Sequence, residues 1–296
     1  MFTRLRYQLR LPSRTLKLGE RTLIMGILNV TPDSFFGGGR SLDAQSAVGQ
    51  AFVLEKAGAD ILDIGGESTR PGADPISLEE ELARVLPVVE GLRGKLRIPI
   101  SLDTQKAKVA EAGLKEGAEI INDVSGLRTE PELAEVVRRH RASLILTHMR
   151  GLPKSMHKGP FARDVMRDIL QGLRASILIA RRAGIPRAKL LLDPGIGFGK
   201  NYKQNFEILA RLPELARLGY PVVAGVSRKG FIGWALAEKR QPWPPEKRQW
   251  GTAAAVTAAI LNGAHIVRVH DVGEALQISR IADVIASAAG RTGSIR

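Results

Sequence analysis

The chain has 296 residues, of which 44% are hydrophobic, so it can bury a sizeable core and is too apolar to be disordered. It contains no cysteine, which excludes disulfides and thiolate catalysis and favours a cytoplasmic location. The net charge of +14 makes nucleic-acid binding an alternative to be weighed. The basic residues are nevertheless spread along the chain, without the aromatic interleaving of RNA-binding motifs, so solvated helix faces explain them better.

No apolar run approaches the roughly 18 residues of a membrane span, and Met1–Arg10 lacks the apolar centre of a secretory signal. We therefore expect neither a membrane nor a nucleic-acid partner. The surplus positive charge is also suited to attracting anionic small molecules.

The chain begins with a predicted β-hairpin, Tyr7–Leu18, which turns at Pro12–Arg14. We assign it to an N-terminal extension over residues 1–20 and expect it to cap the lower mouth of a barrel. The last residues, 290–296, are expected to form a flexible tail. Between them we find no long linker, so a single domain spanning residues 1–296 is predicted.

Short β-prone runs alternate with helix-like runs after the hairpin, the pattern of βα units in a parallel sheet. The strand candidates are Leu23–Leu28, Ile61–Leu62, Ile98–Leu102, Ile120–Ile121, Leu144–Leu146, Leu190–Leu192, Val222–Val223 and Ile266–Val267. The helix candidates are Ala44–Gly58, Leu78–Gly91, Lys106–Gly117, Pro131–His140, Ala162–Gly184, Tyr202–Leu212, Arg248–Gly263 and Gly273–Ala289. Eight successive units favour a closed α/β (β/α)8 TIM barrel over a doubly wound open sheet.

Polar or glycine-rich residues follow each strand candidate, so a barrel would gather them on one face. Asp103, Asn122 and Asp193 stand at such strand ends, where their oxygens suit the N–H groups of a polar heterocycle. Helix N-caps are the plainer alternative for Asp103 and Asn122.

A glycine-rich stretch, DPGIGFGK over Asp193–Lys200, allows the backbone to approach a ligand closely. It fits neither GxGxxG nor GxxxxGK[ST], so it is not a nucleotide-binding signature. The alternative is that these glycines only form ordinary turns. Phe198 either packs on a flat ring or fills the loop.

Arg268 and His270 stand two residues apart at the end of the last strand candidate, so both can point to the same side. Arginine can fork onto phosphate oxygens, and histidine can donate a hydrogen bond or carry charge. The alternative for Arg268 is a surface salt bridge to Asp271 or Glu274.

Seven stretches together resemble the dihydropteroate synthase family, and the resemblance extends from about Leu23 to Val272. They are MGILNVTPDSF from Met25, DIGGESTRPGA from Asp63, SLDT from Ser101, NDVSG from Asn122, DPGIGFGK from Asp193, SRKGF from Ser227 and RVHDV from Arg268. The resemblance implies a (β/α)8 barrel that joins 6-hydroxymethyl-7,8-dihydropterin diphosphate to 4-aminobenzoate and releases pyrophosphate. It also implies a homodimer and a site that sulfonamides target.

The resemblance assigns a role to each matching residue. Pterin binding falls to Asp103, Asn122, Asp193, Lys229, Thr69, Phe198 and Gly225. Diphosphate binding falls to Asn29, Arg268 and His270, with Asn29 also the ligand of Mg2+, the expected cofactor. The 4-aminobenzoate slot is formed by Phe35, Thr69, Arg70, Pro71, Lys229 and Gly230, where Gly230 replaces the serine that the family commonly has.

The reaction needs charge stabilisation more than acid–base catalysis, because pyrophosphate is a good leaving group. We expect a dissociative displacement at the pterin methylene, with Asn29, Arg268, His270 and Lys229 as catalytic residues. Asp33 is the fifth, near the forming cation, although a turn residue after Pro32 is the plainer alternative.

Three other functions compete with this interpretation. A pterin-binding methyltransferase with a corrinoid partner has no use for Arg268 and His270 as diphosphate anchors. An RNA-binding protein rests only on the charge of +14, and a Schiff-base enzyme rests only on Lys229. His148, His157 and Glu67 are expected to be structural or exposed, and no zinc site is predicted.

Overall fold

The computed structural model describes residues 4–31, 40–68, 72–151, 156 and 159–290. Its first element is the predicted hairpin, in which β1 (Tyr7–Arg10) pairs antiparallel with β2 (Thr15–Leu18). Of the expected flexible tail, residues 291–296 lie outside the described part of the chain.

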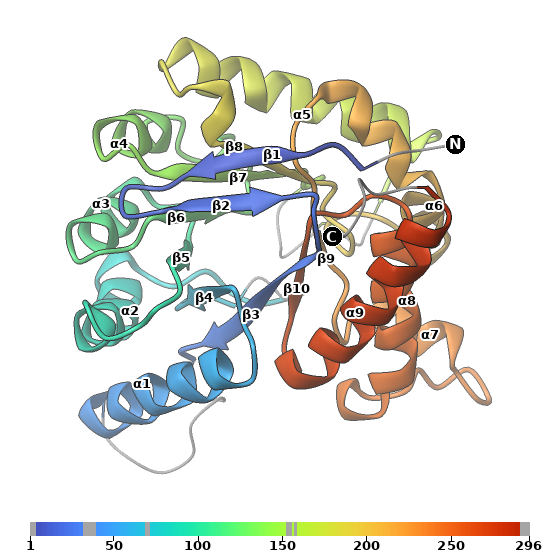
Figure 1. Ribbon diagram of the computed structural model, residues 1–296, viewed down its shortest axis with the longest axis horizontal. Coiled ribbons are helices and arrows are strands. Elements are labelled where there is room, and N and C mark those ends of the chain that lie inside the picture. Colours follow the sequence, from blue (N-terminus) through green and yellow to red (C-terminus); the bar gives the residue numbers. More distant parts are fainter. Residues whose placement is uncertain (1–3, 32–39, 69–71, 152–155, 157–158, 291–296) are drawn as a thin grey trace.

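Within the described residues, one parallel sheet has eight strands in the order β8-β7-β6-β5-β4-β3-β10-β9 (Figure 1). A parallel bridge between Leu192 of β8 and Val222, beside β9, joins the two ends of this order. The sheet therefore closes, which confirms the TIM barrel and excludes the open sheet. The strands are β3 (Leu23–Asn29), β4 (Ile61–Gly65), β5 (Ile100–Asp103), β6 (Ile120–Asp123), β7 (Ser143–Thr147), β8 (Leu190–Asp193), β9 (Val223–Gly225) and β10 (Ile266–Val269).

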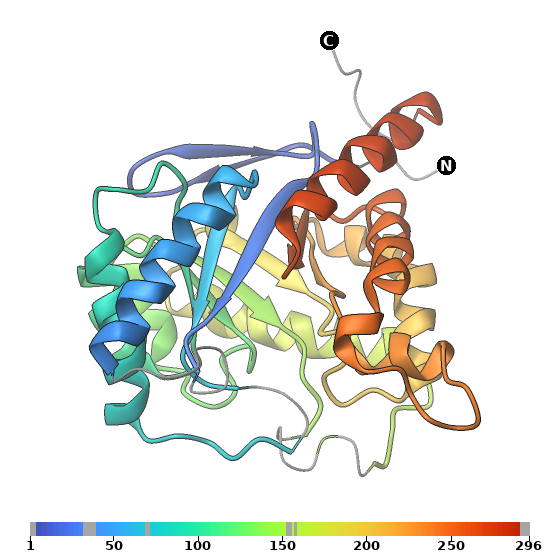
Figure 2. The ribbon, with the colours of Figure 1, turned by 90° about the horizontal axis from the view of Figure 1, so that it is seen from below.

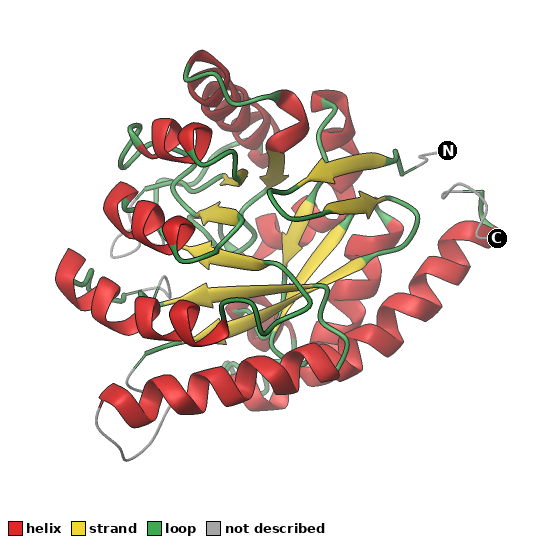
Figure 3. Cartoon of the chain, turned by 60° about the vertical axis from the view of Figure 1, so that its left-hand side comes forward, coloured by secondary structure: helices red, strands yellow, loops and turns green. Residues whose placement is uncertain are grey.

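Helices surround the barrel and pack their apolar sides on the outward residues of the strands (Figure 3). The α-helices of the described chain are α1 (Arg40–Lys56), α2 (Leu78–Leu92), α3 (Ala107–Lys115), α4 (Leu133–Arg139), α5 (Val165–Arg182), α6 (Tyr202–Arg211), α7 (Gly230–Ala235), α8 (Gln249–Leu261) and α9 (Val272–Ala288). The eight predicted helices are confirmed within a few residues at each end. The short α7 was not predicted, because six residues are too few to show a helical period.

Alternate residues of each strand point into the barrel, and those near the N-terminal mouth are apolar. They form a cluster of their own, separate from the outer core: Leu23, Met25, Ile61, Ile120, Ile145, Leu191, Val223 and Ile266. Leu9, Leu11 and Leu18 of the hairpin belong to the same cluster, and Figure 2 shows the hairpin lying across this end of the barrel. The expected cap over the lower mouth is confirmed.

Polar contacts fasten this hairpin to the barrel. The backbone N–H of Ser13 donates to one carboxylate oxygen of Glu119 (2.6 Å), and its hydroxyl donates to the other (3.0 Å). The hairpin and the strands share the apolar cluster inside the barrel, and the strands and helices share the outer core. This sharing supports a single domain, and its boundaries at residues 1 and 296 stay a prediction. None of the described helices has the length and apolar character needed to cross a membrane.

Candidate active site

The inward residues become polar toward the C-terminal ends of the strands. In register, Gly65 of β4 lies beside Asp103 of β5, and Asp103 lies beside Asn122 of β6. On the other side, Gly225 of β9 lies beside Arg268 of β10. Barrel closure thus brings residues from distant parts of the sequence to one rim, as the sequence predicted.

Arg268 is the centre of this rim. Its Nε donates to Asp63 (2.6 Å) and one Nη donates to Asp103 (2.7 Å). Asn122 donates from Nδ2 to the same oxygen of Asp63 (3.1 Å). The alternative of a surface salt bridge is wrong, because Arg268 is an inward residue of β10 and turns away from the outer surface.

Asp271, one of the two alternative partners, pairs instead with Arg228. The distance from Arg228 Nε to a carboxylate oxygen of Asp271 is 3.0 Å. Asp271 begins the turn into α9, beyond the end of the strand, so it faces a different group of side chains.

Asp63 is the functional candidate that sequence reasoning missed. It is fully buried, and its second oxygen, Oδ1, has no hydrogen-bond partner among the described residues. The available signal was its inward position two residues after Ile61, in a strand that is otherwise apolar. A buried carboxylate there requires a cation, and Arg268 supplies it.

The charges of the rim depend on one another. Burial raises the pKa of Asp103 to about 7, and the Arg268 guanidinium opposes that rise. Burial acts against the Arg268 cation, but Asp63 and Asp103 outweigh it and raise the Arg268 pKa. Arg268 is therefore a permanent cation that pairs with both carboxylates.

Lys229 lies across the rim, one residue before α7. Its ammonium donates to the backbone carbonyl of Ile196 and stands 4.2 Å from the centroid of the Phe198 ring. Burial lowers the Lys229 pKa to about 8, against the attraction of Asp193. Phe198 is thus more than loop filler, because its ring face contacts a cation.

Asp193 ends β8 and accepts a hydrogen bond from the backbone N–H of Gly195 through Oδ1 (2.7 Å). Burial raises the Asp193 pKa, and Lys229 opposes that rise. A side chain at Gly225 would begin 3.9 Å from Asp193 Oδ2 and 3.9 Å from Arg268 Cβ. The glycine therefore leaves the floor between these two residues open.

His270 and Asn29 complete the part of the rim that the structure describes. The Nδ1 of His270 is 3.0 Å from the hydroxyl of Ser227. Asn29 is half-buried at the end of β3, in register with Gly65. Among the described residues no group of three His, Cys, Asp or Glu is arranged to hold a metal ion. A single amide oxygen at Asn29 fits Mg2+, which keeps several waters and takes substrate phosphate oxygens.

Five predicted site residues, Asp33, Phe35, Thr69, Arg70 and Pro71, lie outside the described residues. Gly230 opens α7 and is exposed, and a Cβ built there would meet nothing within 4 Å. The roles of all these residues stay predictions.

The histidines and Glu67 were expected to be structural or exposed. His148 is buried, and burial lowers its pKa to about 2, so it is a neutral packed residue. Glu67 forms an ion pair with Lys106 at 2.6 Å. His157 lies outside the described residues.

Most of the chain is similar to known proteins. A family model described as "Pterin binding enzyme" matches residues 25–270. The dihydropteroate synthase of Synechocystis sp. is 47% identical over 267 residues, which cover 90% of this chain and 91% of the relative.

Solved structures are similar over nearly the whole chain. A Yersinia pestis dihydropteroate synthase in complex with a sulfonamide drug has 42% identity and a TM-score of 0.87, covering 95% of this chain and 99% of that one. A Xanthomonas albilineans dihydropteroate synthase with 4-aminobenzoic acid has 41% identity and a TM-score of 0.86, covering 98% and 100%.

Proposed function

Because this chain belongs to the dihydropteroate synthase family of pterin-binding enzymes, transferases of folate biosynthesis, we propose the reaction that it catalyses. It condenses 6-hydroxymethyl-7,8-dihydropterin diphosphate with 4-aminobenzoate, giving 7,8-dihydropteroate and pyrophosphate. The observation that carries this proposal is the rim in which Arg268 joins Asp63 and Asp103 beside Asp193 and Lys229.

The pterin edge binds to oxygens that the fold leaves available. One oxygen of Asp103 is held by Arg268, and one oxygen of Asp193 is held by the Gly195 N–H. Among the described contacts the second oxygen of each has no hydrogen-bond donor, so it can accept from the N–H groups of the aminopyrimidine ring. Asn122 adds an amide, and the Lys229 ammonium donates to the pterin oxygen and ring nitrogen.

Arg268 serves both halves of the substrate. It positions Asp103 for the pterin and presents positive charge to the departing pyrophosphate, to which His270 offers a hydrogen-bond donor. Hydrogen bonding to Ser227 orients the His270 ring. When Mg2+ is bound, held by Asn29, it neutralises phosphate charge. Preorganised charge of this kind suits a dissociative displacement, in which the methylene becomes cationic before the amine attacks.

The 4-aminobenzoate slot is assigned to Phe35, Thr69, Arg70, Pro71 and the Lys229–Gly230 step. The Xanthomonas albilineans relative, solved with 4-aminobenzoic acid, supports this substrate. The Yersinia pestis relative, solved with a sulfonamide drug, supports sulfonamides as inhibitors of this chain.

A homodimer and a cytoplasmic location also stay proposals. The dimer is supported by large apolar side chains exposed on two adjacent helices: Trp250 of α8 and Ile281, Val284 and Ile285 of α9. Light scattering of the purified protein, with Ile281→Lys as the disrupting variant, tests it.

The decisive experiment measures pyrophosphate released from the pterin diphosphate, with and without 4-aminobenzoate and Mg2+. We expect dihydropteroate only when all three are present, with one pyrophosphate released for each dihydropteroate formed; a dissociative path also allows slow pyrophosphate release without 4-aminobenzoate. No dihydropteroate with all three present would contradict the proposed reaction.

A further inference from the structure

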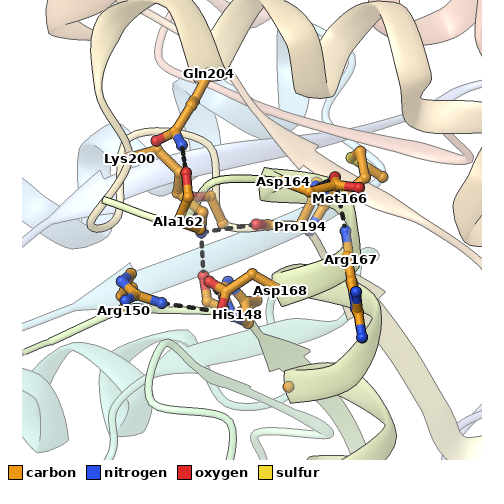
Figure 4. A network of polar contacts seen from close by, with 12 residues as sticks. His148, Arg150, Ala162, Asp164, Met166, Arg167, Asp168, Pro194, Lys200 and Gln204 are labelled. Atoms are coloured by element: carbon orange, nitrogen blue, oxygen red, sulfur yellow. Dashed lines mark hydrogen bonds and ion pairs between the residues drawn. The ribbon is translucent and has the colours of Figure 1, made fainter. Parts of the chain in front are cut away.

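Lys200 is a buried lysine that the proposed reaction does not use. It closes the DPGIGFGK stretch, is 2% exposed, and donates from Nζ to the carbonyl oxygens of His148 (2.7 Å), Gly195 (2.8 Å) and Pro194 (3.0 Å). Figure 4 shows its ammonium between the end of β7 and the start of the loop after β8. Burial lowers the Lys200 pKa, but three carbonyl acceptors require three N–H donors, which only the protonated form supplies.

The loop that Lys200 holds packs backbone to backbone on residues 148–150. A Cβ at Gly195 would stand 1.8 Å from the carbonyl oxygen of His148, and one at Gly199 would stand 2.1 Å from that of Arg150. Both glycines have positive φ, 68° and 69°. Such close packing brings carbonyl oxygens together, and the Lys200 ammonium compensates their converging dipoles.

A second buried side chain secures the middle of the same loop. Asn205 of α6 is 2% exposed, accepts from the Gly197 N–H through Oδ1 (2.6 Å), and donates from Nδ2 to the carbonyl of Asn201 (2.8 Å). The loop is therefore fixed at its base by Lys200 and at its tip by Asn205.

The opposite side of this loop contacts Lys229. The Ile196 carbonyl accepts from the Lys229 ammonium, the Phe198 ring lies 4.2 Å from it, and a Cβ at Gly197 would stand 2.8 Å from Lys229 Cδ. The conformation of the loop thus determines where the Lys229 ammonium stands.

We infer that Lys200 is a positioning residue for pterin binding: by holding two carbonyls of the loop against the carbonyl of His148, it places Ile196 and Phe198 so that they aim Lys229 into the site. This inference rests on the proposed role of Lys229 in binding the pterin. Lys200 itself faces the loop backbone and does not touch the substrate.

The test compares Lys200→Met, which keeps the length of the side chain and removes its donors, with Lys203→Met, an exposed control three residues away. Binding of 6-hydroxymethylpterin is measured by calorimetry from pH 6 to 10, together with the KM for 4-aminobenzoate. We expect Lys200→Met to weaken pterin binding by at least about tenfold and to raise the 4-aminobenzoate KM as well, because Lys229 also lines that slot, whereas Lys203→Met should match the wild type.

The pH dependence separates positioning from a general loss of structure. Lys229 is faced by Asp193 from β8, Asp103 from β5 and Arg268 from β10, and its burial lowers its pKa to about 8. A loosened loop admits water, and loss of the Lys200 charge, which repels Lys229, acts in the same direction, so in Lys200→Met the alkaline decline of pterin binding should move to higher pH. Asn205→Ser, which loosens the same loop without changing any charge, should shift the decline the same way if positioning is the cause. Unchanged affinity, or lost affinity with an unmoved decline, would overturn the inference.

If Lys200→Met does not fold, Asn205→Ser tests the same loop from its other attachment, and it should show the same two changes at smaller size. Wild-type affinity and an unmoved decline in a folded Asn205→Ser would then overturn the inference. Failure of the wild type itself to bind 6-hydroxymethylpterin would instead contradict the proposed function.

Discussion

The two mouths of the barrel are built from the same strands yet have opposite chemistry. Toward the N-terminal mouth the inward residues are apolar, such as Met25 and Ile120, and the hairpin seals them from water. Toward the C-terminal mouth the inward residues are charged or polar, such as Asp63 and Arg268, and they pair with one another. Along each strand, one or two inward-facing positions separate the residues that stabilise the fold from the residues proposed to bind the substrates.

This difference has a physical basis. Apolar burial stabilises by about 25 cal/mol per Å² and needs no exact partner, so the lower layer is weakened mainly by substitutions that remove buried volume. A buried charge is stable only with its partner, so the upper layer tolerates only changes that keep the pairing. Substitutions at the two mouths should therefore fail in different ways.

The largest effect is expected from Asp193→Asn at the C-terminal mouth. The amide keeps the bond from the Gly195 N–H but places an NH2 donor where the pterin needs an acceptor, and it removes the anion beside Lys229. A lost charged hydrogen bond of about 3 kcal/mol corresponds to a kcat/KM loss of at least about 100-fold. Steady-state kinetics and pterin calorimetry measure it.

The exposed Glu132→Gln is a charge-matched control and should behave like the wild type. Unchanged pterin affinity in Asp193→Asn would remove Asp193 from the pterin site.

The complementary change at the N-terminal mouth is Leu18→Ala. Leu18 is fully buried in the hairpin cap, so truncation should lower the free energy of unfolding by about 3 kcal/mol. Because the cap lies far from the rim, kcat/KM at 25 °C should stay within twofold. Urea unfolding and steady-state kinetics of Leu18→Ala test whether the N-terminal mouth affects stability without affecting activity. The exposed Lys17→Ala is the control. Loss of activity in a folded Leu18→Ala would show that the mouths are coupled.

A smaller effect concerns the positive charge of Lys229. This charge should lower the free energy of unfolding and strengthen pterin binding. The folded-state pKa of about 8 is below the ordinary value of 10.5, so the folded chain loses this proton first. The contribution of Lys229 to stability therefore rises from pH 8 to 10.5, while pterin affinity falls.

Lys229→Met isolates this effect. It should raise the free energy of unfolding at pH 7 by about 1–3 kcal/mol and abolish pterin binding. The stability gain over the wild type should shrink as the pH approaches 10.5. Urea titrations at pH 7, 9 and 10.5 measure it, and a gain that is constant with pH would refute the buried-charge explanation.

The smallest effect is expected from Gly230→Ser, which restores the residue common in the family. A side chain there meets no neighbour within 4 Å, so the hydroxyl is free to donate to the 4-aminobenzoate carboxylate. One such hydrogen bond of about 1 kcal/mol lowers the KM for 4-aminobenzoate by about fivefold. Gly230→Ala is the control, and an equal change in both variants would exclude the hydrogen bond.

Much of this protein could be predicted from the order of its residues alone. Repeated alternation of apolar runs and helical periods predicts the barrel, because periodicity is a local property of the chain. The polar residues after the strand ends predict the rim, since parallel strands share one C-terminal face. The hairpin over Tyr7–Leu18 was equally local and was found at its predicted place.

Only the tertiary structure decided which charges meet. Asp63 and Arg268 are 205 positions apart, and their contact depends on barrel closure and strand register. Likewise, no local pattern connects Lys200 to the carbonyl of His148, 52 positions before it. Hydrogen bonds and ion pairs require donor and acceptor atoms within about 3 Å of each other. Sequence periodicity shows which face of a strand or helix a side chain occupies, but it does not fix distances between side chains across a closed sheet.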